Sequence, residues 1–174
     1  MTAAARPTHT QPDIAHIWAW LEQVPDPEIP AVSVVDLGII RDVAWDEDTL
    51  KVTLTPTYSG CPATGVITLD VQTALLKRGL DKVEVVSKLT PPWTTDWISD
   101  TGREKLKAYG IAPPIGTTTC AGMMRVGAVD LPDVNCPRCD SENTERISQF
   151  GSTPCKAAYR CLSCLEPFDY FKTY

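Results

Sequence analysis

The stretch "LKVTLTPTYSGCPATGVITLDVQTALLKRG", residues 50–79, contains the pattern that decides the fold. Its opening "LKVTLTP" alternates apolar and polar side chains, as a half-buried strand does. Pro62 is suited to the first turn of a helix, where the missing N–H is not needed, and the helical pattern ends at Gly79. The stretch therefore predicts a strand, a tight turn that carries Cys61, and a helix.

Hydrophobic spacing on either side of this stretch completes the fold prediction. Residues 12–24 have helical spacing, and residues 39–45 alternate as a strand that would form a hairpin with residues 50–56. Residues 81–89 indicate a third strand, and residues 99–110 a short helix that ends in glycine. The resulting α-β-β-α-β-α order predicts an α+β fold, a two-layer domain in which helices cover a small sheet.

The chain of 174 residues is long enough for one domain and a small additional module. We expect residues 1–11 to be a disordered lead-in and residues 12–110 to form the main domain. Residues 111–135 are rich in Gly, Pro and Thr and lack periodicity, which predicts a linker or an extended segment docked on the domain. Residues 136–174 are predicted to be a separate four-cysteine ribbon.

Composition excludes several functional classes. The net charge of −6 argues against nucleic-acid binding, which requires clustered Lys and Arg. No apolar run approaches the roughly 20 residues that span a bilayer, and the N-terminus lacks the apolar centre of a secretory signal, so we expect no membrane association and a cytoplasmic location. Dinucleotide, P-loop, nucleophile-elbow and Glu-x-x-His motifs are all lacking, which favours a protein that carries or delivers something over an enzyme.

Two close pairs of cysteines, "CPRC" and "CLSC", form the strongest local signal in the sequence. Each pair can present two sulfurs to one ion, and two pairs complete a closed tetrahedral site typical of structural zinc. Such a short tail buries too little apolar surface to fold without a cross-link, so we expect one zinc per chain. The alternatives are an iron–sulfur cluster, or thiols that are unligated or disulfide-bonded. The expected ligands are Cys136, Cys139, Cys161 and Cys164.

The chain has seven cysteines, and three of them lie outside these pairs. Cys155 is interpreted as a small buried apolar residue, and Cys120 receives no role. Cys61 is different because unpaired N–H groups at a helix start favour negative charge and can lower the pKa of a thiol. The resulting thiolate could attack sulfur or bind a soft metal, whereas the alternative is an inert, packed thiol.

A catalytic Cys–His pair would require one of the two histidines, His9 or His16, beside Cys61, and the sequence places neither there. Asp36 is either a turn residue or a carboxylate that faces Cys61 and supports it. In "PPWTTDW", residues 91–97, Trp93 and Trp97 are expected to be core or interface anchors. The segment 94–96 between them either caps the next helix, the favoured interpretation, or lines a pocket.

Three segments then show a family resemblance: "DPEIPAVSVVDLGII", "TLTPTYSGCPATGVITLDV" and "VEVVSKLTPPWTTDWISDTGREKLKAYGIAPP". They resemble the SufT-like domain that is linked to iron–sulfur protein assembly. Residues 12–174 as a whole resemble the PaaD family of phenylacetyl-CoA epoxidase systems, in which this domain precedes a four-cysteine ribbon. The "SGCP", "TTDW" and "YGIAPP" strings, together with the ribbon, carry the match.

This resemblance implies a role in aerobic phenylacetate catabolism. The partners would be the other epoxidase subunits, namely a di-iron oxygenase and a reductase with flavin and a [2Fe–2S] cluster, and a homodimer is left open. The chain would assist maturation of a partner's metal centre instead of catalysing epoxidation, or, alternatively, it would be a purely structural subunit. The resemblance assigns function to Cys61, as a reactive thiol or a transient ligand of iron or a cluster, and to Asp36 as its supporting carboxylate.

Overall fold

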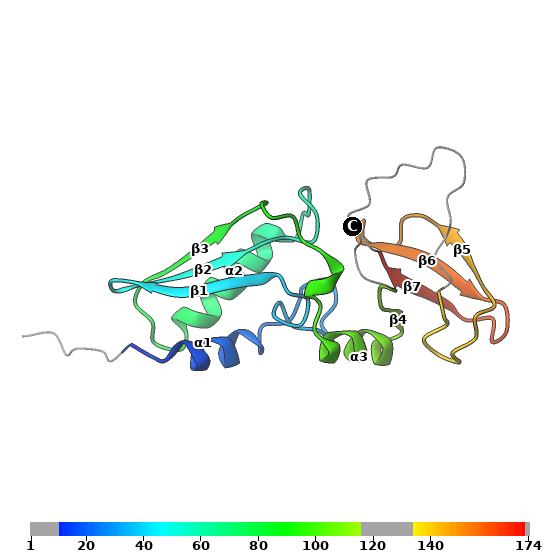
Figure 1. Ribbon diagram of the computed structural model, residues 1–174, viewed down its shortest axis with the longest axis horizontal. Helices are drawn as coiled ribbons and strands as arrows, with labels where there is room; N and C mark the ends of the chain where they lie inside the picture. Colours follow the sequence, from blue (N-terminus) through cyan, green and yellow to red (C-terminus); the bar gives the residue numbers. More distant parts are fainter. Residues whose placement is uncertain (1–10, 116–133, 173–174) are drawn as a thin grey trace, which may run out of the picture.

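The computed structural model of this chain describes residues 11–115 and 134–172. Helices and strands follow the predicted order through the main domain and continue into a second sheet (Figure 1). In chain order the elements are α1 (Ile14–Leu21), β1 (Ile40–Asp46), β2 (Thr49–Leu54), α2 (Thr64–Leu76), β3 (Val83–Ser87), the 3₁₀ turn η1 (Thr95–Trp97), α3 (Asp100–Tyr109), β4 (Ile111–Ala112), β5 (Thr144–Ser148), β6 (Lys156–Cys161) and β7 (Pro167–Phe171). Among the described helices, none is long and apolar enough to cross a membrane.

The main domain is built on a three-stranded sheet in the order β1-β2-β3. β1 and β2 form the predicted antiparallel hairpin, and β3 pairs parallel to β2 after the crossover through α2. Alternation along β2 buries Val52 and Leu54 on one face, while α2 buries Ile67, Val71 and Leu75, which are spaced four residues apart. The sequence pattern of residues 50–79 therefore forms the centre of the α+β domain, as predicted.

Helix α3 begins differently from the preferred prediction. Residues 95–97 form η1, and the Ser99 hydroxyl caps α3 by accepting a hydrogen bond of 2.9 Å from the Gly102 N–H. The prediction that residues 94–96 cap this helix is therefore wrong. Trp93 is buried, as expected, and donates its indole N–H to the Leu37 carbonyl at 2.9 Å. This bond ties the segment before α3 to the loop that precedes β1.

The C-terminal module is a four-stranded sheet in the order β4-β7-β6-β5. Its outer strand β4 comes directly after α3, and Ile111 and Ala112 pair parallel with β7. The segment 111–135, predicted as a linker or docked segment, thus begins as a strand of the ribbon sheet. Residues 116–133 lie outside the described part of the chain.

The two modules share a hydrophobic core. Phe171 at the end of β7 and Cys155 before β6 belong to the same buried cluster as the residues of the main domain. The Phe171 ring lies 6.0 Å from the Trp93 ring, centre to centre, at 52°. In Figure 1 the ribbon lies at one end of the elongated molecule, and α3 and β4 connect it to the three-stranded sheet. The C-terminal strand therefore packs against the loops that carry the candidate site.

Candidate functional site

The four cysteines of the ribbon converge as predicted. Their sulfurs all lie within 4.8 Å of one another, with Cys136 Sγ 3.7 Å from Cys164 Sγ and Cys139 Sγ 3.6 Å from Cys161 Sγ. A tetrahedral ion bound to sulfur at about 2.3 Å requires sulfur–sulfur distances of about 3.8 Å. These four residues therefore fit the coordination sphere of one metal ion and leave no ligand position open.

The backbone supports this cluster at the second knuckle. The N–H groups of Ser163 and Cys164 each donate to Cys161 Sγ at 3.4 Å. These bonds, the one from Cys164 foremost, lower the pKa of the Cys161 thiol to about 6. At Cys161 these bonds thus favour the thiolate form that a metal ion requires.

Cys61 lies in the turn between β2 and α2. Its N–H donates to the Tyr58 carbonyl at 3.2 Å, and its own carbonyl accepts from the N–H and the hydroxyl of Thr64 at 3.2 and 2.9 Å. The turn is thereby closed on both sides of the residue. The side chain is half-buried, so the thiol is held in place but remains reachable.

The Cys61 thiol lines a small cavity, of about 20 Å³, at the junction of the two modules. The loop before β1 contributes Asp26 and Glu28 to its wall, and the ribbon contributes Cys155 and Phe171. Asp26 shapes that loop, because its carboxylate accepts the N–H groups of Glu28 and Ile29 at 2.9 and 2.8 Å. Segments far apart in the sequence therefore meet around one thiol.

The expected lowering of the Cys61 pKa is not found. Burial raises the pKa of this thiol, and the carboxylates of Glu28 and Asp26 raise it further. Hydrogen bonds from the Ala63 N–H and the Thr64 hydroxyl lower the pKa, but their effect is smaller. Helix α2 begins at Thr64, beyond Cys61. The cavity is thus an anionic, partly desolvated place in which the free thiol stays protonated at neutral pH.

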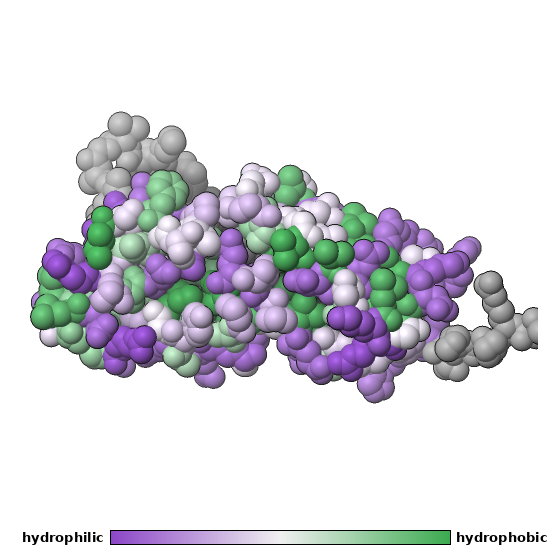
Figure 2. Space-filling view, turned by 180° about the vertical axis from the view of Figure 1, so that it is seen from behind, coloured by the Kyte–Doolittle hydropathy of each residue, from purple (hydrophilic) through white to green (hydrophobic). Residues whose placement is uncertain are grey.

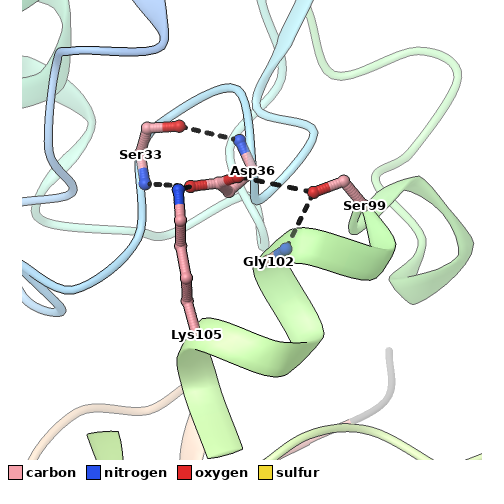
Figure 3. A network of polar contacts seen from close by, with 5 residues as sticks. All are labelled: Ser33, Asp36, Ser99, Gly102 and Lys105. Atoms are coloured by element: carbon pink, nitrogen blue, oxygen red, sulfur yellow. Dashed lines mark hydrogen bonds and ion pairs between the residues drawn. The ribbon is translucent and has the colours of Figure 1, made fainter. Parts of the chain in front are cut away.

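Asp36 lies in a different network, shown in Figure 3. Its carboxylate accepts from the Ser33 N–H at 2.9 Å and from Lys105 Nζ at 2.6 Å, and the Ser99 hydroxyl lies 3.4 Å away. Burial raises its pKa, but the bonds from Lys105 and Ser33 outweigh burial and leave the pKa below its usual value. Asp36 is not among the residues that line the Cys61 cavity. It joins the loop before β1 to helix α3.

Neither histidine is placed beside Cys61 by the described structure. His16 is exposed on α1 and does not line the cavity, and His9 lies outside the described residues. Glu28 and Cys155 line the cavity with Cys61, and sequence reasoning assigned neither to this site. The interpretation of Cys155 as a small buried apolar residue is confirmed, because it is 5% exposed and belongs to the core. Local signals existed for both: "DPE" is an acidic turn beside a structured loop, and Cys155 is an unpaired thiol close to a knuckle. Only the docking of the ribbon brings them together.

Family comparisons agree with this division into two modules. Residues 14–87 match the family described as "Iron-sulfur cluster assembly protein", and residues 126–172 match the "PaaD zinc beta ribbon domain". A protein of Escherichia coli (strain K12), named as a subunit of 1,2-phenylacetyl-CoA epoxidase, is 48% identical over 165 residues, covering 95% of this chain and 96% of that protein. The chain belongs to the PaaD family of phenylacetyl-CoA epoxidase subunits.

Other relatives match the main domain without the ribbon. The Fe-S protein maturation auxiliary factor YitW of Bacillus subtilis (strain 168) is 43% identical over 86 residues, covering 48% of this chain and 83% of that protein. A crystal structure from Bacillus anthracis, of the domain of unknown function DUF59, superposes with a TM-score of 0.50 at 35% identity. It covers 53% of this chain and 89% of that chain. The PaaD family thus joins this domain to a cysteine ribbon.

Proposed function

We propose that this chain is an accessory subunit that assists assembly of an iron centre in a partner subunit of phenylacetyl-CoA epoxidase and does not form the epoxide itself. The observation that carries the proposal is the cavity in which Cys61 meets Cys155 and Glu28. Thiol and carboxylate groups bind transition-metal ions. The proposal is also supported by similarity of the main domain to an Fe-S protein maturation auxiliary factor and to the iron–sulfur cluster assembly family.

We assign zinc to the ribbon, with one ion per chain held by the four thiolates. Four sulfurs with no open ligand position suit a structural ion better than a catalytic one. The module contributes few large apolar side chains of its own, so the ion supplies much of its stability. In this proposal the zinc holds the ribbon in shape, and the ribbon in turn holds Cys155 and Phe171 at the Cys61 cavity.

The test is co-expression of the chain with the oxygenase and reductase subunits, followed by iron analysis of each purified partner. Cys61→Ser should leave the fold intact and remove most iron from one partner, because the thiol that handles the iron is lost. Ser59→Ala, which alters an exposed residue of the same turn and keeps the thiol, should leave partner iron at the wild-type level. Normal iron in both partners of Cys61→Ser would refute the proposal.

A purely structural subunit is the second candidate, and one observation favours it. Helix α2 exposes the apolar residues Val66, Leu69 and Leu76, which could pack on a partner. Figure 2, which views the molecule from behind, shows apolar side chains at several places along its length. If this candidate is correct, Cys61→Ser will co-purify in stoichiometric amount with a fully active epoxidase.

A further inference from the structure

Strand β3 is an outer strand of the three-stranded sheet, and within the described residues no strand pairs with its far side. In Figure 1 it forms the upper border of that sheet. The Lys88 N–H donates to the Leu54 carbonyl of β2 at 2.8 Å. Because the backbone groups of successive residues in a strand point to opposite sides, the N–H and C=O groups of Val85 and Ser87 point away from β2. Such an edge is a template for a further strand.

The solvent side of β3 has a charge pattern that is complementary to itself. Glu84 and Lys88 are both exposed, and they lie two residues before and two residues after Val86 on the same face of the sheet. Glu84 lies 4.0 Å from Lys51, whose closer partner is Asp46 at 2.6 Å. If a second copy of β3 lies antiparallel with Val86 opposite Val86, each Glu84 comes to lie opposite a Lys88.

The backbone permits this register. With Val86 opposite itself, Val85 of one copy lies opposite Ser87 of the other, and both residues direct their N–H and C=O groups outward. They can therefore exchange two hydrogen bonds, and the two-fold axis repeats the exchange. A register centred on Val85 would instead set Lys82 opposite Lys88, which is repulsive, and one centred on Ser87 would separate the opposite charges. Charge thus selects one register.

Helix α2 exposes apolar side chains beside this edge. Gln72 Nε2 donates to the Val83 carbonyl at 3.1 Å, which places this side of α2 over the outer edge of β3. Leu69 and Leu76 lie three and four residues from Gln72 on the same side of the helix, and they are 61% and 43% exposed. Leu89, which is 54% exposed, would lie opposite Val83 of a second copy. A second copy would therefore cover these side chains.

The opposite edge of the sheet differs from β3. In β1 the pairing register shifts between Ile40 and Asp42, whereas β3 pairs with β2 without a shift. A bulge twists an edge strand and discourages pairing with a further strand. The sheet thus has one irregular edge at β1 and one regular edge at β3.

We propose that two copies of this chain associate through β3, antiparallel and with Val86 on the two-fold axis. The three strands of each copy then form one continuous sheet, and the two α2 helices lie side by side on one face of it. Glu84 of each copy pairs with Lys88 of the other. None of these three residues lines the Cys61 cavity, so the dimer is independent of the proposed function.

Sedimentation equilibrium of the zinc-loaded full chain over a range of concentrations tests this pairing. The wild type should be a dimer that dissociates on dilution. Glu84→Lys sets like charges opposite each other at two symmetric positions, so the dissociation constant should rise by at least about tenfold. The double variant Glu84→Lys/Lys88→Glu reverses the pair and should restore the dimer. Asp42→Lys makes a similar charge change at an exposed residue of β1 and should leave the dissociation constant at the wild-type value.

A cysteine on the two-fold axis tests the register. Directly opposed residues that do not exchange hydrogen bonds have Cα atoms about 4.5 Å apart, which is within the range that a disulfide spans. Val86→Cys should therefore form a disulfide-linked dimer on mild oxidation, seen as a doubled mass without reductant. The wild type and Asp42→Cys should stay uncross-linked under the same conditions, because the opposite edge of the sheet does not pair.

Each result decides the matter. A wild type that is monomeric at every concentration would overturn the inference, as would a dimer that tolerates Glu84→Lys, because another surface would then hold it. A double variant that stays monomeric would reject the antiparallel self-pairing. If the chain alone is monomeric but Glu84→Lys lowers its co-purification with an epoxidase subunit, the edge binds a strand of that partner instead of a second copy.

Discussion

Replacement of Asp36 by asparagine distinguishes a structural carboxylate from one that acts on Cys61. In the structure Asp36 accepts from the buried Ser33 N–H and pairs with Lys105 Nζ at 2.6 Å. The Lys105 side chain is 44% exposed and that of Asp36 11%, so solvent screens the pair and its contribution is about 1 kcal/mol. Asp36→Asn keeps an acceptor for Ser33 and should lower the free energy of unfolding by about 1 kcal/mol.

Asp36→Ala should cost more, because it also leaves the Ser33 N–H buried without a partner. That penalty is about 1–3 kcal/mol, which gives a total of about 2–4 kcal/mol. Urea denaturation at pH 7, followed by circular dichroism, measures both variants. Lys105→Met is the matched control: combined with Asp36→Asn, it should add little further loss, because the pair is already broken.

The pH dependence has a defined sign. The pKa of Asp36 is lower in the folded protein than in the unfolded chain, so its stabilising effect is complete above the unfolded value of about 4. It is lost as pH falls through the folded value. The gap between wild type and Asp36→Asn should therefore shrink on acidification. An Asp36→Asn protein with unchanged stability that fails to load partner iron would refute the structural role.

Two further predictions concern the ribbon. Cys139→Ser should reduce bound zinc from one per chain to none and unfold the ribbon, because an ion held by four thiolates contributes on the order of 10–16 kcal/mol to the folding free energy. Iron in place of zinc in the wild-type protein would contradict the assignment. Phe171→Ala should lower the free energy of unfolding by about 3–5 kcal/mol, because the side chain is only 1% exposed. It should also speed alkylation of Cys61, because Phe171 lines the same cavity. An unchanged alkylation rate would show that the ribbon does not cover the thiol.

Local sequence patterns predicted the main domain well. Alternation at Val52 and Leu54 and the spacing of Ile67, Val71 and Leu75 encode which faces are buried, and both depend only on neighbours along the chain. The two cysteine pairs likewise encode the metal cluster, because each knuckle is a local structure.

The site depends on contacts that no local pattern encodes. Asp26 and Glu28 come from one loop of the main domain and Cys61 from another, and Cys155 joins them at the cavity because the ribbon docks on that domain. The position of Cys61 near a helix start predicted a lowered pKa for its thiol. Burial and the nearby carboxylates raise the pKa, and their effect is the stronger one. The family resemblance assigned Asp36 to the same site as Cys61. In the structure its hydrogen bonds to Ser33 and Lys105 join the loop before β1 to helix α3.

Direct transfer of iron tests the central claim. The full chain is loaded with one isotopically labelled Fe²⁺ and mixed anaerobically with metal-free oxygenase or reductase subunits, and label in the re-isolated partner is counted. The account predicts that label passes to one partner faster than from free Fe²⁺ and that Cys61→Ser abolishes this advantage. Equal rates with wild type, Cys61→Ser and free Fe²⁺ would contradict it.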